Sequence, residues 1–297
     1  MCGIVGLFLK DKGLEPQLGA LTAGMLGTMC ERGPDSAGFA LYSPGRDGEV
    51  KLTLRGGPAT DFARLETELR DAVGPLAMTR RDTHAVIALP EAAAGPAIDW
   101  LKANAPDVSL AGRGRRMELF KEVGSPDKVA DRFGLAAMAG SHAISHTRMA
   151  TESAVTIDGA HPFSTGPDQC LVHNGSLSNH NNVRRNLIRE GLRFETENDS
   201  EVAAGYLTWR LREGLTLGEA LTACLDDLDG FYTFVVGTEN GFGVLRDGIA
   251  CKPAVMAETD RYVAFGSEYR ALARLPDIGT ARVWEPDPAT VYFWERG

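Results

Sequence analysis

The strongest constraint in this sequence is an apolar segment at its very start. Residues 2–9, CGIVGLFL, are apolar and partly β-branched, and the charged turn 10–13 follows them. A run of this kind is typical of a buried strand. Because chain termini normally fray, a core strand that begins at the second residue indicates that the terminus is held in place for a purpose.

The rest of the chain predicts more strands than helices. Apolar residues recur at helical spacing over 16–30, and this helix leads into the polar loop 32–36. Further helices are expected over 92–103, over 179–190 and from 199 onward, with Asp199 placed to cap the last one. Strands are expected at 38–42, 83–89, 117–123, 141–148, 170–175, 230–237, 243–246 and 262–266.

Composition restricts the class of protein. The 297 residues carry 31 Lys and Arg against 40 Asp and Glu, a net charge of −9 that argues against a nucleic-acid partner. No apolar run is long enough to span a membrane, and no signal peptide begins the chain. The five cysteines are widely spaced without a C-x-x-C pair, so neither a disulfide framework nor a metal site is expected. A cytoplasmic protein that acts on small molecules or binds other proteins fits best.

The segment from about 45 to 140 differs in its sequence pattern from the rest of the chain. A strand at 83–89, a helix at 92–103 and a strand at 117–123 predict a compact β-α-β insertion. Loops of such length are generally functional or fold separately. We therefore expect a single domain over 1–297 that this insertion interrupts.

Cys2 follows the initiator methionine, which aminopeptidases remove before small residues. The mature chain is then expected to begin with a free cysteine, which carries a thiol and an α-amine together. An α-amine has a pKa of about 7.7 to 8.0 and a free thiol about 8.5, so the amine can take the thiol proton near neutral pH. Taken alone, a cysteine here also fits a small apolar residue that merely opens a strand.

Six short motifs accompany Cys2 in a fixed order. They are MCGIVG at the start, RGPDS at 32–36, HTR at 146–148, HPF at 161–163, HNG at 173–175 and NDSE at 198–201. In this order the chain resembles the class II glutamine amidotransferases of the N-terminal nucleophile hydrolases. The resemblance implies an α+β fold, a four-layer αββα sandwich with two antiparallel sheets between helices, and it covers the chain except for the insertion.

The resemblance implies a catalytic role for three residues. Cys2 would attack the side-chain amide of glutamine, release ammonia and leave a glutamyl thioester that water hydrolyses. Asn174, through its side-chain amide, and Gly175, through its backbone N–H, would stabilise the oxyanion. Without the resemblance, the Asn-Gly pair would be interpreted as a hairpin turn.

The resemblance also implies two anchors for the substrate. Arg148 matches the arginine that binds the α-carboxylate, and Asp199 matches the aspartate that binds the α-ammonium group. Their simpler interpretations are a surface arginine and a helix N-cap. Roles in the substrate loop are implied for Thr151 and His161, and supporting roles beside the nucleophile for Arg32 and His146.

The segment that follows Arg148 departs from the family pattern. Where many relatives have RWATHG, this chain has RMATES at 148–153, so Met149 replaces the tryptophan and Glu152 replaces the histidine. The predicted nucleophile and oxyanion residues remain, but the rim of the glutamine site is altered. Glutamine affinity and the preferred amide are therefore open.

The ammonia would need an acceptor. Because few residues follow the closing strand at 262–266, we expect the acceptor on a separate subunit. Length and insertion resemble the amidotransferase-like subunits of N-methylglutamate synthases, also called methylamine–glutamate N-methyltransferases, and their GlxB-type relatives. That resemblance implies a hetero-oligomer with glutamate synthase-like partner subunits, which would carry FMN and an iron–sulfur cluster. An amidotransferase for another synthase, and a catalytically silent subunit that senses glutamine or glutamate or acts as a scaffold, stay open.

Overall fold

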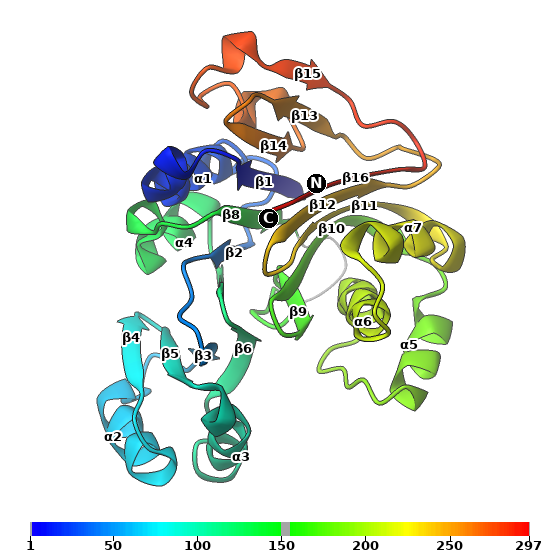
Figure 1. Ribbon diagram of the computed structural model, residues 1–297. Helices are drawn as coiled ribbons and strands as arrows, with labels where there is room; N and C mark the ends of the chain where they lie inside the picture. The colour runs from blue at the N-terminus through cyan, green and yellow to red at the C-terminus, as the bar shows by residue number, and fades with distance from the viewer. Residues whose placement is uncertain (1, 150–154, 297) are drawn as a thin grey trace.

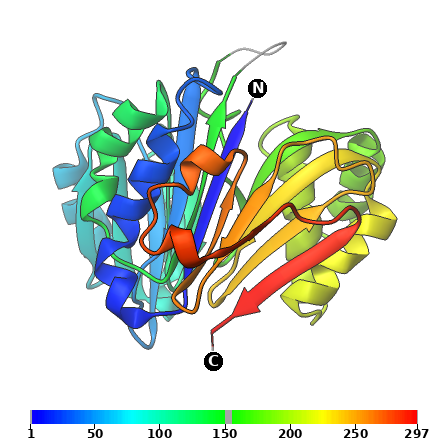
Figure 2. The same ribbon diagram turned by 90° about the horizontal axis from the view of Figure 1, so that it is seen from above.

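The main body of the computed structural model, which describes residues 2–149 and 155–296, consists of two antiparallel sheets packed face to face (Figure 2). The larger sheet has the order β15-β13-β14-β1-β8-β2-β7 and the smaller β16-β12-β11-β10-β9. The larger sheet comprises β1 (Gly3–Leu9), β2 (Ser36–Tyr42), β7 (Met117–Val123), β8 (His142–Arg148), β13 (Val255–Glu258), β14 (Tyr262–Gly266) and β15 (Arg282–Trp284). The smaller comprises β9 (Phe163–Gly166), β10 (Gln169–Leu177), β11 (Gly230–Gly237), β12 (Gly241–Arg246) and β16 (Thr290–Glu295).

Helices cover the outer faces of both sheets, which gives the expected αββα sandwich (Figure 1). Helices α1 (Leu18–Gly27) and α4 (Pro126–Phe133) pack on the larger sheet. The smaller sheet is covered by α5 (His180–Arg189), α6 (Asp199–Arg212) and α7 (Leu217–Asp227). No helix within 2–149 or 155–296 combines the length and apolarity that crossing a membrane requires.

The N-terminal strand lies inside this sandwich, as its sequence predicts. β1 pairs with β14 on one side and with β8 on the other. Its side chains alternate, because successive residues of a strand point to opposite faces. Ile4 and Phe8 belong to the core between the sheets, whereas Val5, Leu7 and Leu9 belong to the core under α1. The start of the chain is therefore fixed on both faces and both edges.

The insertion forms a sheet of its own, with the order β4-β5-β3-β6. Its elements alternate as β-α-β-β-α-β, and this connectivity with this strand order is the ferredoxin-like arrangement. A separate apolar core, which includes Leu52, Leu69, Ile87 and Leu101, lies between the sheet and its helices. The elements are β3 (Glu49–Arg55), α2 (Phe62–Val73), β4 (Ala77–Arg81), β5 (His84–Pro90), α3 (Ala94–Asn104) and β6 (Ser109–Gly114).

The separate sheet ends earlier than the predicted insertion. The strand at 117–123 exists, but it pairs with β2 in the larger sheet, and α4 packs on that sheet too. The reason is visible in its side chains, because Met117 and Leu119 belong to the core between the sheets and Phe120 to the core under the helices. A buried strand pattern predicts a strand, but it does not say which sheet receives it.

Candidate active site

The predicted nucleophile lies where strand ends from both sheets meet. Cys2 is half-buried directly before β1. Its backbone carbonyl accepts a hydrogen bond from Arg32 Nε at 3.1 Å and another from Asn174 Nδ2 at 3.4 Å. The fold thus brings the predicted nucleophile, the predicted oxyanion amide on β10 and the predicted supporting arginine into one cluster.

Three residues that the sequence analysis did not assign hold the start of β1. The backbone N–H groups of residues 3 and 4 donate to Thr147 Oγ1 at 3.2 Å and to Ser267 Oγ at 2.9 Å. Glu268 forms an ion pair with Arg32 Nη1 at 2.6 Å, and this hydrogen bond lowers the pKa of the glutamate. Ser267 and Glu268 directly follow the strand predicted at 262–266, but nothing in the sequence shows that they face the N-terminus.

Gly175 is required by its conformation and by its neighbour. Its φ is +146°, a region that residues with a side chain rarely adopt. A Cβ built on it would lie 2.0 Å from the carbonyl oxygen of Phe231 on β11. The pair Asn174–Gly175 lies within β10 opposite residues 232 and 233, so its interpretation as a hairpin turn is wrong.

The predicted substrate anchors lie at the C-terminal end of β8 and at the start of α6. Arg148 ends β8, and a Cβ built on Gly159 would lie 3.2 Å from its Nη1, so the guanidinium adjoins the loop that precedes β9. Asp199 Oδ2 accepts a hydrogen bond from the backbone N–H of Leu177 at 2.9 Å. Asp199 is not the helix cap, because Asn198 is the N-cap of α6 and accepts from the backbone N–H at 200. Thr151 and Glu152 lie outside the described residues.

Histidines form a buried cluster behind these residues. His161 Nε2 and His173 Nδ1 each lie 2.8 Å from Ser200 Oγ, and His146 Nε2 lies 3.1 Å from the carbonyl oxygen of His173. The rings of His146 and His161 stack with centroids 4.0 Å apart. Burial lowers the pKa of all three, that of His146 to about 3, so they are neutral near pH 7. Their geometry suits them to position the loops around the site, and Ser200, which joins two of them, was not identified from the sequence.

Comparison with known proteins gives this arrangement a context. The profile of a family described as a glutamine amidotransferase domain matches residues 146–274. The chain is 64% identical over 296 residues to the glutamine amidotransferase-like protein GlxB of Rhizobium meliloti, covering 99% of this chain and 98% of the relative. This chain belongs to the class II glutamine amidotransferase family. The family predicted from the order of the six motifs is thereby confirmed.

More distant amidotransferases share parts of the chain or only its fold. A glutamine–fructose-6-phosphate aminotransferase of Vibrio vulnificus is 36% identical over 121 residues, which are 41% of this chain and 20% of that enzyme. The glutamine phosphoribosylpyrophosphate amidotransferase of B. subtilis has a similar structure, with a TM-score of 0.62 and 19% identity, over 99% of this chain and 47% of that one. These likenesses support the amidotransferase fold and leave the chemistry to the site residues.

Proposed function

We propose that the chain is a glutaminase subunit whose nucleophile is Cys2. The observation that carries this proposal is the convergence of Asn174 Nδ2 and Arg32 Nε on the Cys2 carbonyl, at a strand end fixed from both sides. Removal of Met1 would free the α-amine of Cys2, which then takes the thiol proton. A nucleophile on a rigid element, with an amide donor beside it, is what acyl transfer from a carboxamide requires.

The reaction runs in two steps. In the first, the Cys2 sulfur forms a bond to the side-chain carbonyl carbon of glutamine, and the α-ammonium group of Cys2 gives its proton to the leaving nitrogen as the C–N bond breaks. The oxyanion accepts hydrogen bonds from the Asn174 amide and the Gly175 N–H. In the second, water attacks the thioester with the α-amine as base and releases glutamate. The neutral buried histidines take no part in proton transfer.

Substrate recognition rests on charge. The Arg148 guanidinium would bind the α-carboxylate of glutamine, and the Asp199 carboxylate would bind the α-ammonium group. His161 and Thr151 would shape the loop around the substrate, and Arg32 and His146 would support the surroundings of the nucleophile. Asp199 Oδ2 accepts a hydrogen bond from the Leu177 N–H and Oδ1 accepts one from Ser200 Oγ at 3.3 Å, but the side chain is 21% exposed, so it can still meet a ligand.

We further propose that the ammonia passes to glutamate synthase-like partner subunits, in an N-methylglutamate synthase whose FMN and iron–sulfur cluster belong to the partner. The identity with GlxB supports the subunit type. An amidotransferase that supplies another synthase has the same site and a different partner.

One observation favours a second candidate, a catalytically silent subunit that senses glutamine or glutamate or acts as a scaffold for its partners. Met149 stands where many family members have tryptophan, and its side chain is 38% exposed. Replacing tryptophan with methionine removes an aromatic ring from the rim, which would lower affinity for glutamine. The nucleophile, the oxyanion amide and both charged anchors are nevertheless present, which favours the enzyme.

The test is glutamine-dependent release of ammonia and glutamate by the chain alone and in complex with its partner subunits. We expect activity in the wild type, none in Cys2→Ala and unchanged activity in Cys251→Ala, which removes an exposed thiol. Activity that survives in Cys2→Ala would exclude Cys2 as the nucleophile. Glutamine binding without ammonia release in every assembly would establish the silent subunit. Transfer to methylamine and glutamate, compared with other acceptors, identifies the synthase.

A further inference from the structure

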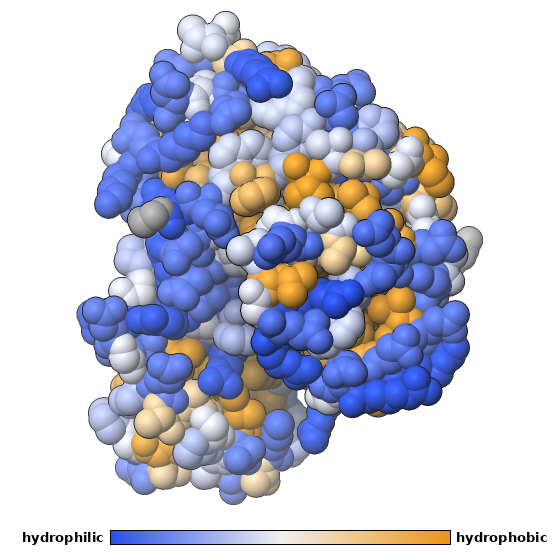
Figure 3. Space-filling model, turned by 45° about the vertical axis from the view of Figure 1, so that its right-hand side comes forward, coloured by the Kyte–Doolittle hydropathy of each residue, from blue (hydrophilic) through white to orange (hydrophobic). Residues whose placement is uncertain are grey.

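A cavity of about 470 Å³ lies where the insertion meets the main body. Strands β3 and β6 and helix α3 line it from the insertion, and β7, β9 and the segment before α6 line it from the sandwich. In Figure 3 the surface is hollowed where the insertion, at the bottom, adjoins the main body. Its size is that of a site for a small molecule.

Charge distinguishes this cavity from the rest of the molecule. Of the described residues that line it, five are cationic and three are acidic, although the whole chain carries a net charge of −9. The cations come from both sides of the junction. They are Arg55, Lys102 and Arg113 from the insertion, and Lys121 and Arg193 from the main body.

Two of the three carboxylates are already engaged. Asp158 forms an ion pair with Arg55 at 2.7 Å. The Glu201 carboxylate accepts three hydrogen bonds of 2.7 to 2.8 Å from the backbone N–H groups of residues 195 and 196 and from Thr196 Oγ1. Only Glu195, which is exposed, remains to balance the other four cations.

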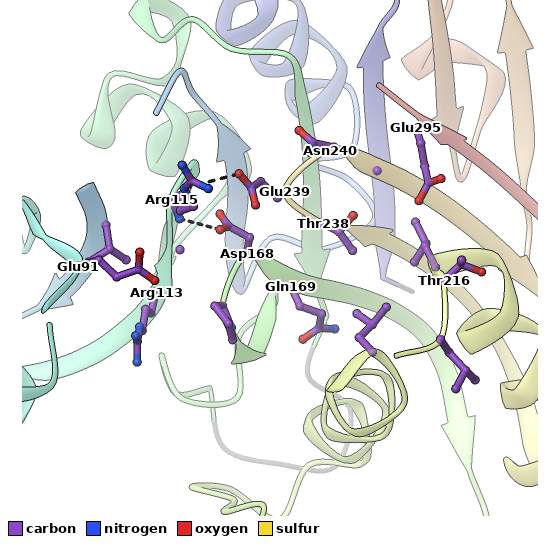
Figure 4. Close-up of a pocket in the computed structure, with 17 residues that line it drawn as sticks. Glu91, Arg113, Arg115, Asp168, Gln169, Thr216, Thr238, Glu239, Asn240 and Glu295 are labelled. Atoms are coloured by element: carbon purple, nitrogen blue, oxygen red, sulfur yellow. Dashed lines mark hydrogen bonds and ion pairs between the residues drawn. The ribbon is translucent and has the colours of Figure 1, made fainter. Parts of the chain in front are cut away.

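Several of the cations lack a partner. The side chains of Lys102, Arg113 and Arg193 make no hydrogen bond or ion pair within the described residues, and Arg113 Nε is buried there without an acceptor. Figure 4 draws the adjacent cavity, in which Arg115 engages Asp168 and Glu239, whereas Arg113 meets Asp168 only through its backbone carbonyl and its side chain makes no interaction there. Lys102 and Arg193 are exposed and can be hydrated, but the buried Nε of the half-buried Arg113 costs free energy without an acceptor, and a bound anion would recover it.

Lys121 adds a cation that is poorly compensated. Its Nζ donates to the carbonyl oxygen of Ala160 at 3.0 Å and lies 4.8 Å from the centre of the Phe163 ring. No carboxylate forms a salt bridge with it within the described residues, and burial lowers its pKa to about 8. An anion in the cavity would favour the charged form of this amine.

We propose that this cavity binds a small organic anion with at least two acidic groups, and that the anion acts on the glutamine site. Cations from two walls suit acidic groups at two ends of a ligand, and the apolar side chains of Ile98, Leu101 and Leu110 suit a carbon skeleton between them. Phosphate and carboxylate groups share this chemistry, and the experiment distinguishes them.

The route to the glutamine site is short. Asp158, held by Arg55, precedes His161 by three residues, and Glu201 follows Asp199 by two. Both predicted substrate residues therefore sit on segments that line the cavity. An anion that competes with Asp158 for Arg55 would release the loop before β9 and change how readily Cys2 reacts. This coupling rests on the proposed function, whereas binding of the anion does not.

Binding is tested by isothermal titration calorimetry of the full chain with citrate and, separately, with inorganic pyrophosphate. We expect saturable binding of at least one, weakened about tenfold or more in Arg113→Gln and in Arg193→Gln, because each removes a charged contact. Arg185→Gln, which removes an arginine on α5 outside the cavity, should bind as the wild type does. Preference for one probe identifies carboxylate or phosphate recognition. Absence of saturable binding by both probes, or equal affinity in all variants, would overturn the site.

Coupling is tested by the rate at which a glutamine-like electrophile, 6-diazo-5-oxo-norleucine, labels the chain with and without the bound probe. We expect the rate to change at saturating probe in the wild type and to stay constant in Arg113→Gln at the same concentration. An unchanged rate in the wild type, despite measured binding, would overturn the coupling. A chain that binds the probe but is never labelled would count against the proposed glutaminase and leave the anion site standing.

Discussion

Replacing Gly175 with alanine tests whether the paired strands β10 and β11 depend on a missing side chain. The added methyl group would sit 2.0 Å from the Phe231 carbonyl oxygen and 2.7 Å from the Cα of Tyr232. Both are backbone atoms of a neighbouring strand, so neither can rotate away. The two strands must separate at this pair, which also displaces the N–H predicted to stabilise the oxyanion.

The expected cost has two parts. A side chain held at φ +146° costs about 1–3 kcal/mol, and forced displacement of packed backbone costs about another 1–3 kcal/mol. Gly214 and Gly191 separate these parts, because both have positive φ but a Cβ would meet nothing within 4 Å. Gly230 resembles Gly175, with the same φ and a Cβ 2.2 Å from the Ser176 carbonyl oxygen.

Calorimetric melting of the four alanine variants measures both parts. At about 2 °C per kcal/mol for a chain of this size, we expect a fall of about 4–12 °C for Gly175→Ala and Gly230→Ala, and about half of that for Gly191→Ala and Gly214→Ala. Labelling of Cys2 should slow in Gly175→Ala and not in Gly214→Ala. Equal melting temperatures for all four variants would refute the close-approach argument.

Three further predictions concern charge and protonation. Asp199→Asn keeps an acceptor for the Leu177 N–H but loses the anion, so the KM for glutamine should rise about tenfold or more in a glutaminase assay, and an unchanged KM would refute its role. Asn174→Ala removes an oxyanion donor and should lower kcat about 10²–10³-fold, whereas a loss confined to KM would contradict that role. Burial lowers the pKa values of His142 and His146 from an ordinary 6.5 to about 3. The unfolded chain therefore binds these protons first, so the free energy of unfolding is full above about pH 6.5. It falls as the pH drops from 6.5 towards 3, by about 1.4 kcal/mol per pH unit for each histidine. The melting temperature should follow this course, with a shallower slope in His142→Gln; identical slopes would show that this histidine does not contribute.

Local patterns predicted eight strands of the main body, the family resemblance supplied their arrangement as a sandwich, and the insertion was predicted only in part. The apolar run at 2–9 and the strands near 142–148 and 230–237 were predicted from their sequences, and they are mostly buried in the structure. β4 was not predicted, because its residues are half-buried or exposed and show no such pattern. The strand at 117–123 was predicted, but its assignment to the larger sheet depends on pairing with β2, which lies 75 residues or more away in the chain.

The candidate site was also predictable from the sequence only in part. The family motifs named Cys2, Asn174 and Arg32, and the fold brings these three together. Glu268 and Ser200 were not assigned, because their partners lie far off in the chain: Glu268 meets an arginine 236 positions away, and Ser200 joins histidines 27 and 39 positions away. A serine or glutamate has no local signature for such a role, and only the three-dimensional arrangement supplies it.

The central claim is that Cys2 is an N-terminal nucleophile which faces a glutamine site. Its most direct test is the intact mass of the purified chain before and after treatment with 6-diazo-5-oxo-norleucine, with the labelled residue mapped by peptide sequencing. We predict that Met1 is absent and that one adduct forms on Cys2 alone, equally in Cys251→Ala and not at all in Cys2→Ala. Retention of Met1, or a Cys2 that stays unlabelled even with partner subunits present, would contradict the claim and favour the silent subunit.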